Sequence, residues 1–389
     1  MDQRHRLSIL FVAYAGLALA DFVPDDQVVS DRAGDLPQPE FDRATSRIIW
    51  QDRQNRLWVG QVDSITGVLD PTNGKGELVD TGLAPPGQSG NTPRYTYGRD
   101  QHAIVYTKSV DGHLHLAKAV ETATNWQLTL LENGADRWHA NGTPEETTGL
   151  AMIVYNQEGP VSTVVSWREL DHPDSEQTVD VLHAGGRFLG TEPALLVLGR
   201  DATHVMQVFQ IPFATGVPEQ ITFGSESKQS AFIWWAPEYQ SYIFTVMVDV
   251  AELAFYRRID GVWANFYQLS IPNGKPYVSS PEAFVINDTS YVAVVSCDHI
   301  DPSVWQPRGA SQLWVTGIDP ANPFFRRIDD PSYRAQRMEP EPYLLEGEAV
   351  VYYTEIDPVT KFHLAKRART GLTDAGADGL LEIAAAGPD

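Results

Sequence analysis

Two stretches of the chain, VYTKSVDGHLHLAKA (105–119) and VYYTEIDPVTKFHLAKRA (351–368), repeat one pattern. Each begins with an apolar run, continues through an acidic residue and a turn, and ends on a run that contains His-Leu-Ala-Lys. Short apolar runs bounded by turn residues predict β-strands, and an Asp beside Gly or Pro predicts a tight turn between them. The same strand-turn-strand unit therefore occurs at two distant places in the chain.

Further copies recur at intervals of roughly 50 residues, a spacing typical of propeller blades and other arrays. A first short strand is expected at PEFD (39–42), PRYT (93–96), PEET (144–147), SAFI (230–233), PEAF (281–284) and PEPY (340–343). A second and a third strand follow each start, and several copies end with a fourth strand, such as GELVDTG (76–82). One further copy, the least regular, lies at 194–224.

Seven copies of four short strands, without a long helical period, predict an all-β fold: a seven-bladed β-propeller with four-stranded antiparallel blades around a central channel. Six or eight blades remain compatible with the pattern. Within the least regular copy, VFQIPFATGVPEQIT (208–222) resembles the third and fourth strands of TolB-like propeller blades. This resemblance covers one blade and implies a fold but no activity.

The composition limits the partners that the protein can have. The 389 residues, of which 42% are hydrophobic, are enough to fill a large core. The chain has 51 acidic and 29 basic residues, and the resulting formal charge of -22 disfavours binding to nucleic acid or to an anionic membrane. Cys297 is the single cysteine, so no intramolecular disulfide forms, and its acidic neighbours should raise the pKa of its thiol.

The N-terminal residues predict export. MDQRHR (1–6) gives a basic start, LSILFVAYAGLALA (7–20) an apolar segment, and Ala18-Leu19-Ala20 a small-x-small end, which together are typical of a signal peptide over 1–20. The segment is short for a membrane span, so we expect no integral span after processing and a periplasmic or secreted protein. Alternatively these residues form propeller strands and the protein is cytoplasmic. We expect one propeller domain over 21–389, with a partly loose tail at 371–389.

The topology of a propeller predicts which loops share a face. In a meandering blade, the turn between the second and third strands lies on the same face as the start of the first strand. One acidic residue falls at or near this turn in each copy: Asp52, Asp111, Glu158, Asp201, Asp249, Asp298 and Asp357. Such a set of acids could bind cations or a polyhydroxylated ligand, whereas the alternative is that each acid only stabilises its own turn.

The starts of the first strands provide candidate catalytic residues. Glu40, Arg94, Glu145, Glu282 and Glu341 should approach the channel axis. Carboxylates that face each other across a channel suit glycoside hydrolysis, with one acting as acid and the other as nucleophile or base. In a lyase, His139 or Tyr97 would act as the base, and Arg94 or Arg137 would neutralise the substrate acid. The repeat alone can also place Glu there for structural reasons.

Two loops depart from the repeat, at 135–146 and 296–310. Long loops that carry His, Trp, Arg and Asp on a rigid scaffold are typical of binding sites. The expected ligand-binding residues are Arg137, Trp138, Asn141, His299, Trp305 and Arg308. Asp298 and Asp301 are candidate metal ligands, which leaves a structural calcium ion open and implies no other cofactor. An insertion without function is the alternative.

Our leading hypothesis is an exported propeller that binds a glycan or another hydroxylated small molecule at the channel mouth, with hydrolase or lyase activity left open. The first alternative is a TolB-like scaffold that binds a protein partner without catalysis. The second is an intracellular biosynthetic cyclase or alkylating enzyme. The chain contains no Gly-x-Ser-x-Gly elbow, phosphate loop or dinucleotide fingerprint that would indicate another enzyme class.

Overall fold

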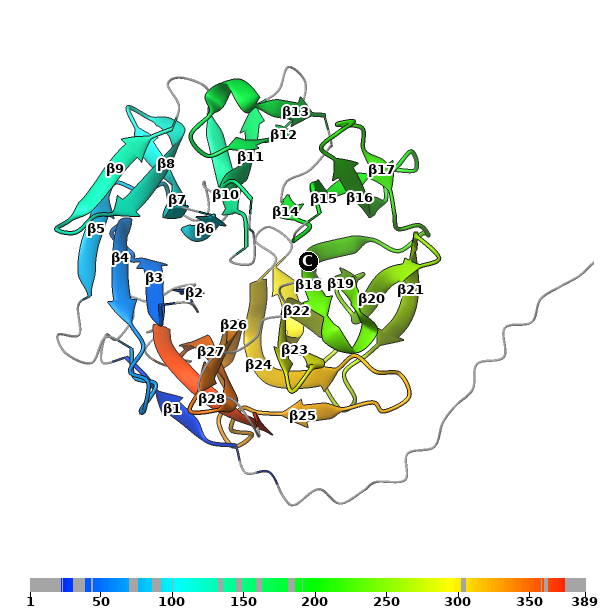
Figure 1. Cartoon of the computed structure of the whole chain (residues 1–389). Helices are drawn as coiled ribbons and strands as arrows, with labels where there is room; N and C mark the ends of the chain where they lie inside the picture. The colour runs from blue at the N-terminus through cyan, green and yellow to red at the C-terminus, as the bar shows by residue number, and fades with distance from the viewer. Residues whose placement is uncertain are drawn as a thin grey trace, which may run out of the picture.

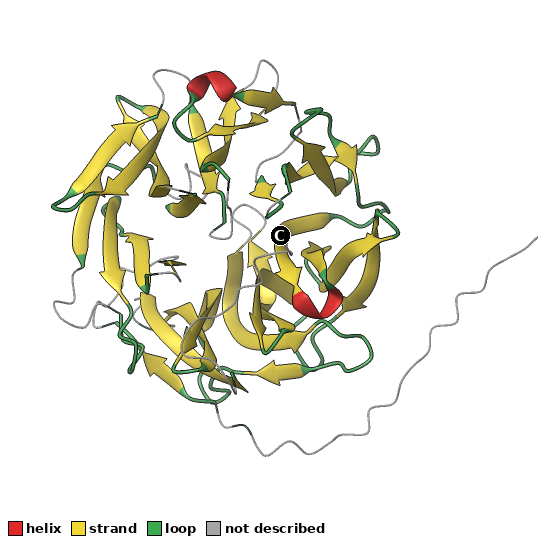
Figure 2. Cartoon of the chain, in the orientation of Figure 1, coloured by secondary structure: helices red, strands yellow, loops and turns green. Residues whose placement is uncertain are grey.

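The strands form seven antiparallel four-stranded sheets, arranged as blades around a central channel (Figure 1). The predicted seven-bladed β-propeller is therefore confirmed. The computed structural model describes residues 22, 24–30, 39–42, 45–69, 76–85, 92–99, 101–131, 136–144, 149–158, 163–180, 186–190, 192–301, 306–357, 359 and 363–374. Within these ranges the helical elements are two short 3-10 helices, η1 (Pro173–Ser175) and η2 (Pro237–Tyr239) (Figure 2).

Blades 1 to 4 each run from an inner strand at the channel to an outer strand at the rim. Their strands, in that order, are β2 (Glu40–Asp42), β3 (Arg47–Gln51), β4 (Arg56–Gln61) and β5 (Glu77–Thr81); β6 (Arg94–Gly98), β7 (Gln101–Val110), β8 (His113–Glu121) and β9 (Trp126–Leu130); β10 (Arg137–Gly142), β11 (Met152–Glu158), β12 (Thr163–Glu169) and β13 (Gln177–Val179); and β14 (Arg187–Phe188), β15 (Ala194–Arg200), β16 (Met206–Pro212) and β17 (Glu219–Gln220).

Blades 5 to 7 have longer inner strands than blades 1 to 4. Their strands, again from the channel outward, are β18 (Lys228–Ala236), β19 (Ser241–Val248), β20 (Glu252–Ile259) and β21 (Val262–Leu269); β22 (Tyr277–Ile286), β23 (Thr289–Asp301), β24 (Gln306–Gly317) and β25 (Phe325–Arg327); and β26 (Gln336–Leu345), β27 (Glu348–Ile356), β28 (His363–Thr373) and β1 (Asp26–Val28).

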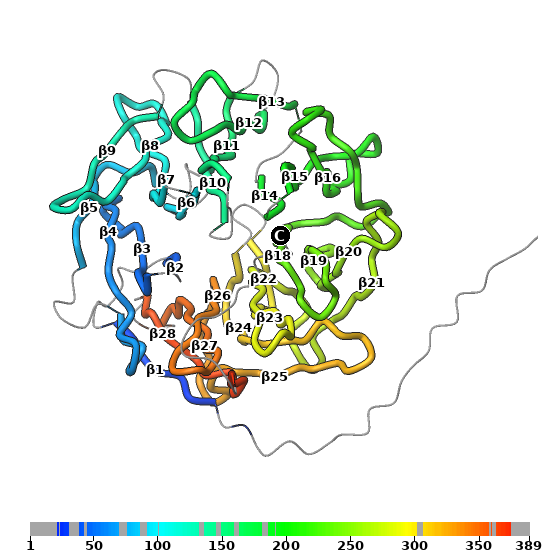
Figure 3. Tube along the Cα trace, viewed as in Figure 1, coloured from blue at the N-terminus to red at the C-terminus, as the bar shows by residue number. Residues whose placement is uncertain are grey.

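Blade 7 is closed by a strand from the other end of the fold. β1 pairs with β28, with Asp26 opposite Ala368 and Val28 opposite Lys366, after the chain has passed once around the ring (Figure 3). The sequence repeat contains no fourth strand after 351–368, and β1 supplies it. This pairing joins the first and last described strands, so the ring has no open edge between blades 7 and 1.

The core lies between neighbouring blades rather than in one central mass. One cluster, for example, packs Phe284 and Val295 of blade 6 against Leu344 and Tyr353 of blade 7. The second and third strands of each blade bury apolar side chains on both faces, because each blade is covered by a neighbour on either side. The rigid ring that results fixes the inner strands around the channel.

The sequence repeat predicted the wrong inner strand for blade 3. PEET (144–147) was expected to begin that blade, but its inner strand is β10 (Arg137–Gly142) and Pro144 follows the strand. The Pro-Glu pair at 144–145 therefore imitates a blade start without forming one. Glu145 itself lies outside the described residues.

Four inner strands share a β-bulge that includes one residue with positive φ. These residues are His139, Ser230, Ser280 and Glu339, with φ between 49° and 59°. A bulge bends its strand and re-aims the side chains that follow. Two residues after each of them, the strand presents a side chain to the channel.

No helix in the described ranges combines the length and apolar character that a bilayer crossing demands. The predicted signal peptide at 1–20 lies outside the described residues, as does most of the predicted tail. Within the tail, β28 continues as a strand to Thr373.

Candidate functional site

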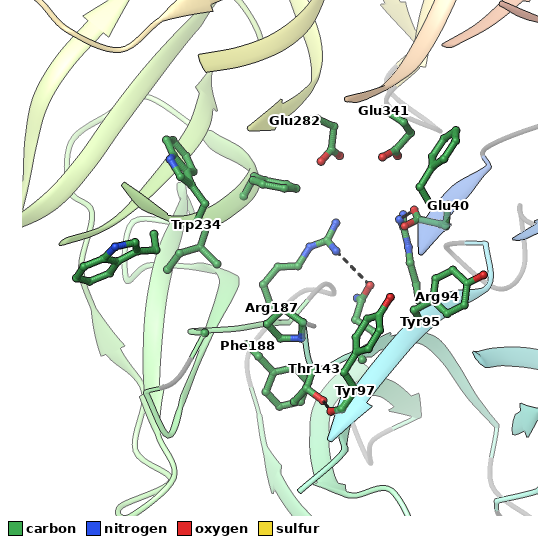
Figure 4. A pocket seen from close by; sticks show the side chains of 18 of the residues that line it. Glu40, Arg94, Tyr95, Tyr97, Thr143, Arg187, Phe188, Trp234, Glu282 and Glu341 are labelled. Atoms are coloured by element: carbon green, nitrogen blue, oxygen red, sulfur yellow. Dashed lines mark hydrogen bonds and ion pairs between the residues drawn. The ribbon is translucent and has the colours of Figure 1, made fainter. Parts of the chain in front are cut away.

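Each blade contributes one side chain at the same position of its inner strand to a single cavity of about 210 Å³ in the channel (Figure 4). In sequence this position follows a Pro, Ala or Gly in every blade. We call the seven residues the channel ring: Glu40, Arg94, Asn141, Arg187, Phe232, Glu282 and Glu341, in the order of blades 1 to 7. Four of the five predicted blade-start residues therefore meet in one place.

The channel ring divides its charges between two halves. The acidic half consists of Glu282, Glu341 and Glu40 on the adjacent blades 6, 7 and 1. In the basic half, Arg94 on blade 2 and Arg187 on blade 4 flank the amide of blade 3. Arg94 forms an ion pair with Glu40 where the two halves meet. The amide, Asn141, accepts a hydrogen bond from Arg187 Nη1 at 3.4 Å, which links blades 3 and 4.

Arg94 lies in an unusual environment for a guanidinium group. Burial, and to a smaller extent the positive charge of Arg187, lower its pKa to about 10. Its buried Nε has no hydrogen-bond partner among the described residues. A buried N–H without an acceptor is costly, so this group favours an acceptor in the cavity.

Blade 5 gives the cavity an apolar side. Phe232, Trp234 and Trp235 of β18 all line it, and Trp235 packs edge-on against Tyr242 at a ring-centroid distance of 5.2 Å. Trp234 is only 4% exposed, and its Nε1 donates a hydrogen bond to Ser290 Oγ at 3.1 Å. The wall is therefore held in place by contacts within blade 5 and with blade 6.

Tyr97, a predicted base, lines the same cavity but its hydroxyl already has a partner. The hydroxyl donates to Asp42 Oδ1 at 3.2 Å. The His102 ring stacks on the Tyr97 ring at 4.8 Å, and His102 Nε2 lies 3.3 Å from Asp42 Oδ2. The fully buried carboxylate of Asp42 thus holds both rings, of which Tyr97 lines the cavity.

His139, the other predicted base, has the positive-φ position in the β10 bulge. Its side chain is partly exposed. The surrounding protein nevertheless lowers its pKa to about 3, mainly because burial disfavours the charged imidazole and, to a smaller extent, because Arg187 and Arg94 are positively charged. The imidazole is therefore neutral at neutral pH. A base with so low a pKa is a weak proton acceptor under those conditions.

Two other predicted ligand-binding residues of β10 do not line the cavity. Arg137 pairs with Glu176, with 3.2 Å between Nη1 and Oε2, and its Cζ lies 5.5 Å from the centroid of the Tyr155 ring. These contacts hold it inside blade 3. Trp138 is half-buried on the same strand.

The loop at 296–310 is an extension of the β23–β24 hairpin. Its acids pair with cations, Asp298 with Lys275 and Asp301 with Arg308. His299 and Arg308 are exposed, and Trp305 lies outside the described residues. Among the described residues, no group of three or more His, Cys, Asp or Glu side chains is arranged to hold a metal ion.

This hairpin contacts the inner strand of blade 7 through two hydrogen bonds. Gln306 Nε2 donates to Glu339 Oε1 at 3.2 Å, and Gln336 Nε2 donates to the carbonyl of Pro307 at 2.7 Å. The pair between Lys275, at the start of blade 6, and Asp298 places the blade start beside this hairpin. Blade starts and second-to-third turns therefore share a face, as the topology predicts.

Two acids of these turns, Asp52 and Asp201, stabilise local structure. Asp52 is 3% exposed and accepts hydrogen bonds from the backbone of residues 54 and 56, and from Trp58 Nε1 at 2.8 Å. Asp201 accepts the backbone N–H groups of Thr203 and Val205. These bonds are those of the turn-forming alternative.

Cys297 is fully buried in β23, and burial is the largest cause that raises the pKa of its thiol to about 11. The charge of Asp298 raises this pKa by a smaller amount. A thiol with this pKa is a poor nucleophile, as predicted, although burial contributes more than the acids do.

Two residues of the channel ring were missed in the sequence. Arg187 begins β14, a strand of two residues that leaves almost no periodic signal. Phe232 lies in the expected strand at 230–233, but an apolar residue there suggests core rather than site. Both residues follow a small residue, Gly186 or Ala231, and this position could have indicated Phe232, whose blade start was recognised.

Comparisons with known proteins find the fold but no family. No protein-family model matches the chain, and no curated protein matches it. The solved β-propeller domain of Cps50 (Swd1) from Myceliophteria thermophila has 9% identity and a TM-score of 0.53, with 88% of this chain and 99% of that one covered. The AfRom2 CNH domain has 7% identity and a TM-score of 0.51, with coverages of 88% and 98%.

TolB from Acinetobacter baumannii also matches, at 11% identity and a TM-score of 0.38. The match covers 70% of this chain, which spans 64% of the length of that structure. At such identities the likenesses show the fold alone. The seven four-stranded sheets give the chain the fold of a seven-bladed β-propeller, and the matches to the Cps50 (Swd1) and AfRom2 domains agree with that fold.

Proposed function

We propose that this protein is a non-catalytic binding propeller, a rigid platform whose central channel holds a small ligand or a chemical group of a partner molecule. The observation that carries the proposal is the channel ring: seven side chains from seven blades line one cavity, with acids and arginines in separate halves. Fixed polar groups beside an apolar wall are typical of ligand sites.

Of the two predicted bases, one has a structural partner and the other an unsuitable pKa, which favours binding over catalysis. The Tyr97 hydroxyl donates to the buried Asp42, and His139 has a pKa of about 3. The turn acid Asp52 is engaged in its own turn. A propeller fold hosts binding and catalytic functions alike, so the site and not the fold supports this choice.

Calorimetric titration with a panel of small anions, cations, zwitterions and neutral sugars tests the proposal. We expect at least one class to bind, and Arg187→Met to weaken that binding at least tenfold. Arg200→Met is the matched control, because it removes the same charge from an exposed position of the same blade. Equal weakening by both variants, or no binding by any class, would contradict the proposal.

A second candidate function is glycoside hydrolysis. It is favoured by one observation: Glu282 and Glu341 line the same cavity from adjacent blades, close to aromatic side chains. Under this candidate, release of reducing ends from a polysaccharide panel should occur and should fall by orders of magnitude in Glu282→Gln and in Glu341→Gln. Activity that is absent in the wild type, or unchanged in both variants, rejects it.

Export is part of the proposal. It is supported by the basic, apolar and small-x-small parts of residues 1–20. Intact-mass measurement of the native protein tests it: we expect a mature chain that begins near Asp21, and an N-terminus at Met1 contradicts export.

A further inference from the structure

We propose that the ligand of the channel is a zwitterion, a small molecule that carries both an ammonium group and a carboxylate, as free amino acids do. This inference rests on the proposed binding function and names the chemical class that the channel ring selects. It is argued from the two charged halves, from the apolar wall and from the size of the cavity.

The acidic half provides the ammonium subsite. Figure 4 shows the carboxylates of Glu282 and Glu341 directed into the space that also receives the Arg187 guanidinium. The cavity wall carries three glutamates against two arginines, one negative charge more than positive. An ammonium group donates up to three hydrogen bonds, which carboxylates on neighbouring blades can accept together. A ligand with anionic groups alone would face these carboxylates without compensation.

The basic half provides the carboxylate subsite. Arg187 and Arg94 line the same cavity, and the charge of Arg187 lowers the pKa of Arg94, so the two like charges repel each other. A carboxylate between them relieves this repulsion and accepts paired hydrogen bonds from the planar guanidinium groups. It can also supply the acceptor that the buried Nε of Arg94 lacks among the described residues.

The apolar wall and the volume restrict the remainder of the ligand. Phe232, Trp234 and Phe188 offer an apolar surface beside the charged groups. A cavity of about 150 Å³ accommodates benzene, so a cavity of about 210 Å³ suits a molecule of amino-acid size. A neutral sugar carries no charge to offer to either half, which argues against the hydroxylated ligand expected from the sequence.

The test is calorimetric titration of the full chain with glycine, β-alanine, 4-aminobutyrate, 6-aminohexanoate and L-phenylalanine. The first four compounds place the same two charges at increasing separation, so the tightest binder measures the distance between the subsites. For that compound, N-acetylation and amidation remove one charge each. We expect each derivative to bind at least tenfold more weakly than the zwitterion.

Variants assign the two subsites. Glu282→Gln should weaken zwitterion binding at least tenfold and should remove most of the penalty of N-acetylation, because the carboxylate and the ammonium act as a pair. Arg187→Met should do the same for amidation. Glu219→Gln, on the exposed outer strand of blade 4, and Arg200→Met should leave both affinities unchanged. If Arg187→Met does not fold, Arg187→Lys keeps the charge but loses the planar fork, and it should weaken carboxylate binding.

The outcomes separate this inference from the proposed function. If a neutral sugar binds with sensitivity to Arg187→Met while every amino acid fails, the zwitterion is overturned and the binding function stands. If the acetylated or amidated compound binds as tightly as its parent, one subsite is wrong and the inference fails. If no compound of any charge class binds the folded wild type, both proposals fail together.

Discussion

Arg337 should be among the most sensitive positions of the ring, and its substitution tests how blades 6 and 7 are joined. The side chain is 1% exposed, and its Nη1 lies 3.0 Å from Asp329 Oδ2 while its Nε lies 3.4 Å from Glu355 Oε2. It also donates to the carbonyls of Ser311 at 2.8 Å and Tyr333 at 3.0 Å. Arg337→Met keeps an unbranched but shorter side chain and removes these interactions, together with the hydrogen bond to the carbonyl of Asp330 at 3.3 Å.

The size of the effect follows from the partners that remain. Removing one member of a buried ion pair costs about 3–5 kcal/mol, because the other member is left buried and uncompensated. Asp329 keeps Arg327 at 2.8 Å, and Glu355 keeps Lys366 at 2.7 Å, so we expect the lower end of that range. With about 2.1 cal/mol/K of unfolding entropy per residue over 389 residues, about 3 kcal/mol lowers the melting temperature by about 4 °C.

Differential scanning calorimetry of the wild type and the variant measures this shift. The control is Arg308→Met, which breaks the pair with Asp301 at a side chain that is 65% exposed and should cost less than about 1 kcal/mol. Equal melting temperatures for Arg337→Met and the wild type would refute the reasoning, because the buried carboxylates would then not depend on the guanidinium. A larger loss for Arg308→Met would refute it as well.

Three further substitutions test the local structure. His139 has a pKa of about 3 in the folded protein against an ordinary value of 6.5, so between these values the unfolded chain binds a proton that the folded chain does not, and the free energy of unfolding should fall as the pH falls from 6.5 towards 3. Asn tolerates the positive φ at this position, and His139→Asn removes the titrating group. Between pH 7 and pH 5 the free energy of unfolding, measured in urea, should therefore fall less in the variant than in the wild type, by up to about 1.4 kcal/mol per pH unit. Gly190→Ala places a Cβ against the hydroxyl of Tyr242 and should destabilise the protein by about 2 kcal/mol, whereas Gly261→Ala, also at positive φ but in open space, should cost about 1 kcal/mol in the same assay. Asp52→Asn puts an amide N–H against the indole N–H of Trp58 and should lower the free energy of unfolding by about 2 kcal/mol, as measured by thermal unfolding. A loss below about 0.5 kcal/mol, the size of a surface substitution, would contradict the role of Asp52 as the buried acceptor of this turn.

The middle strands of the blades could be predicted from sequence because burial on both faces produces a strong local signal. Strands such as β7 and β27 are long apolar runs bounded by turns, and they lie where expected. The inner strand β10 could not be placed, because the Pro-Glu pair at 144–145, just after the strand, imitates the start of the other blades. β1 is three residues long and mostly exposed, so only its distant partner β28 defines it.

The candidate site was predictable where the repeat and the function coincide. Glu282 and Glu341 follow a Pro at a recognisable blade start, and both line the cavity. Arg187 could not be found by the same rule, because its strand is too short to mark a blade start. The separation of acids from arginines depends on the order of the blades around a closed ring, which no local pattern contains.

The pairing of β1 with β28 has a consequence for biosynthesis. On the ribosome, Asp26 to Val28 are the first of the described strands to emerge, while their partners near Lys366 are translated almost at the end. Until then, the strand must wait unpaired beside a growing arc of blades, and the channel cavity, which draws on all seven, does not yet exist. The cavity therefore forms all at once, when synthesis is nearly complete, and not blade by blade.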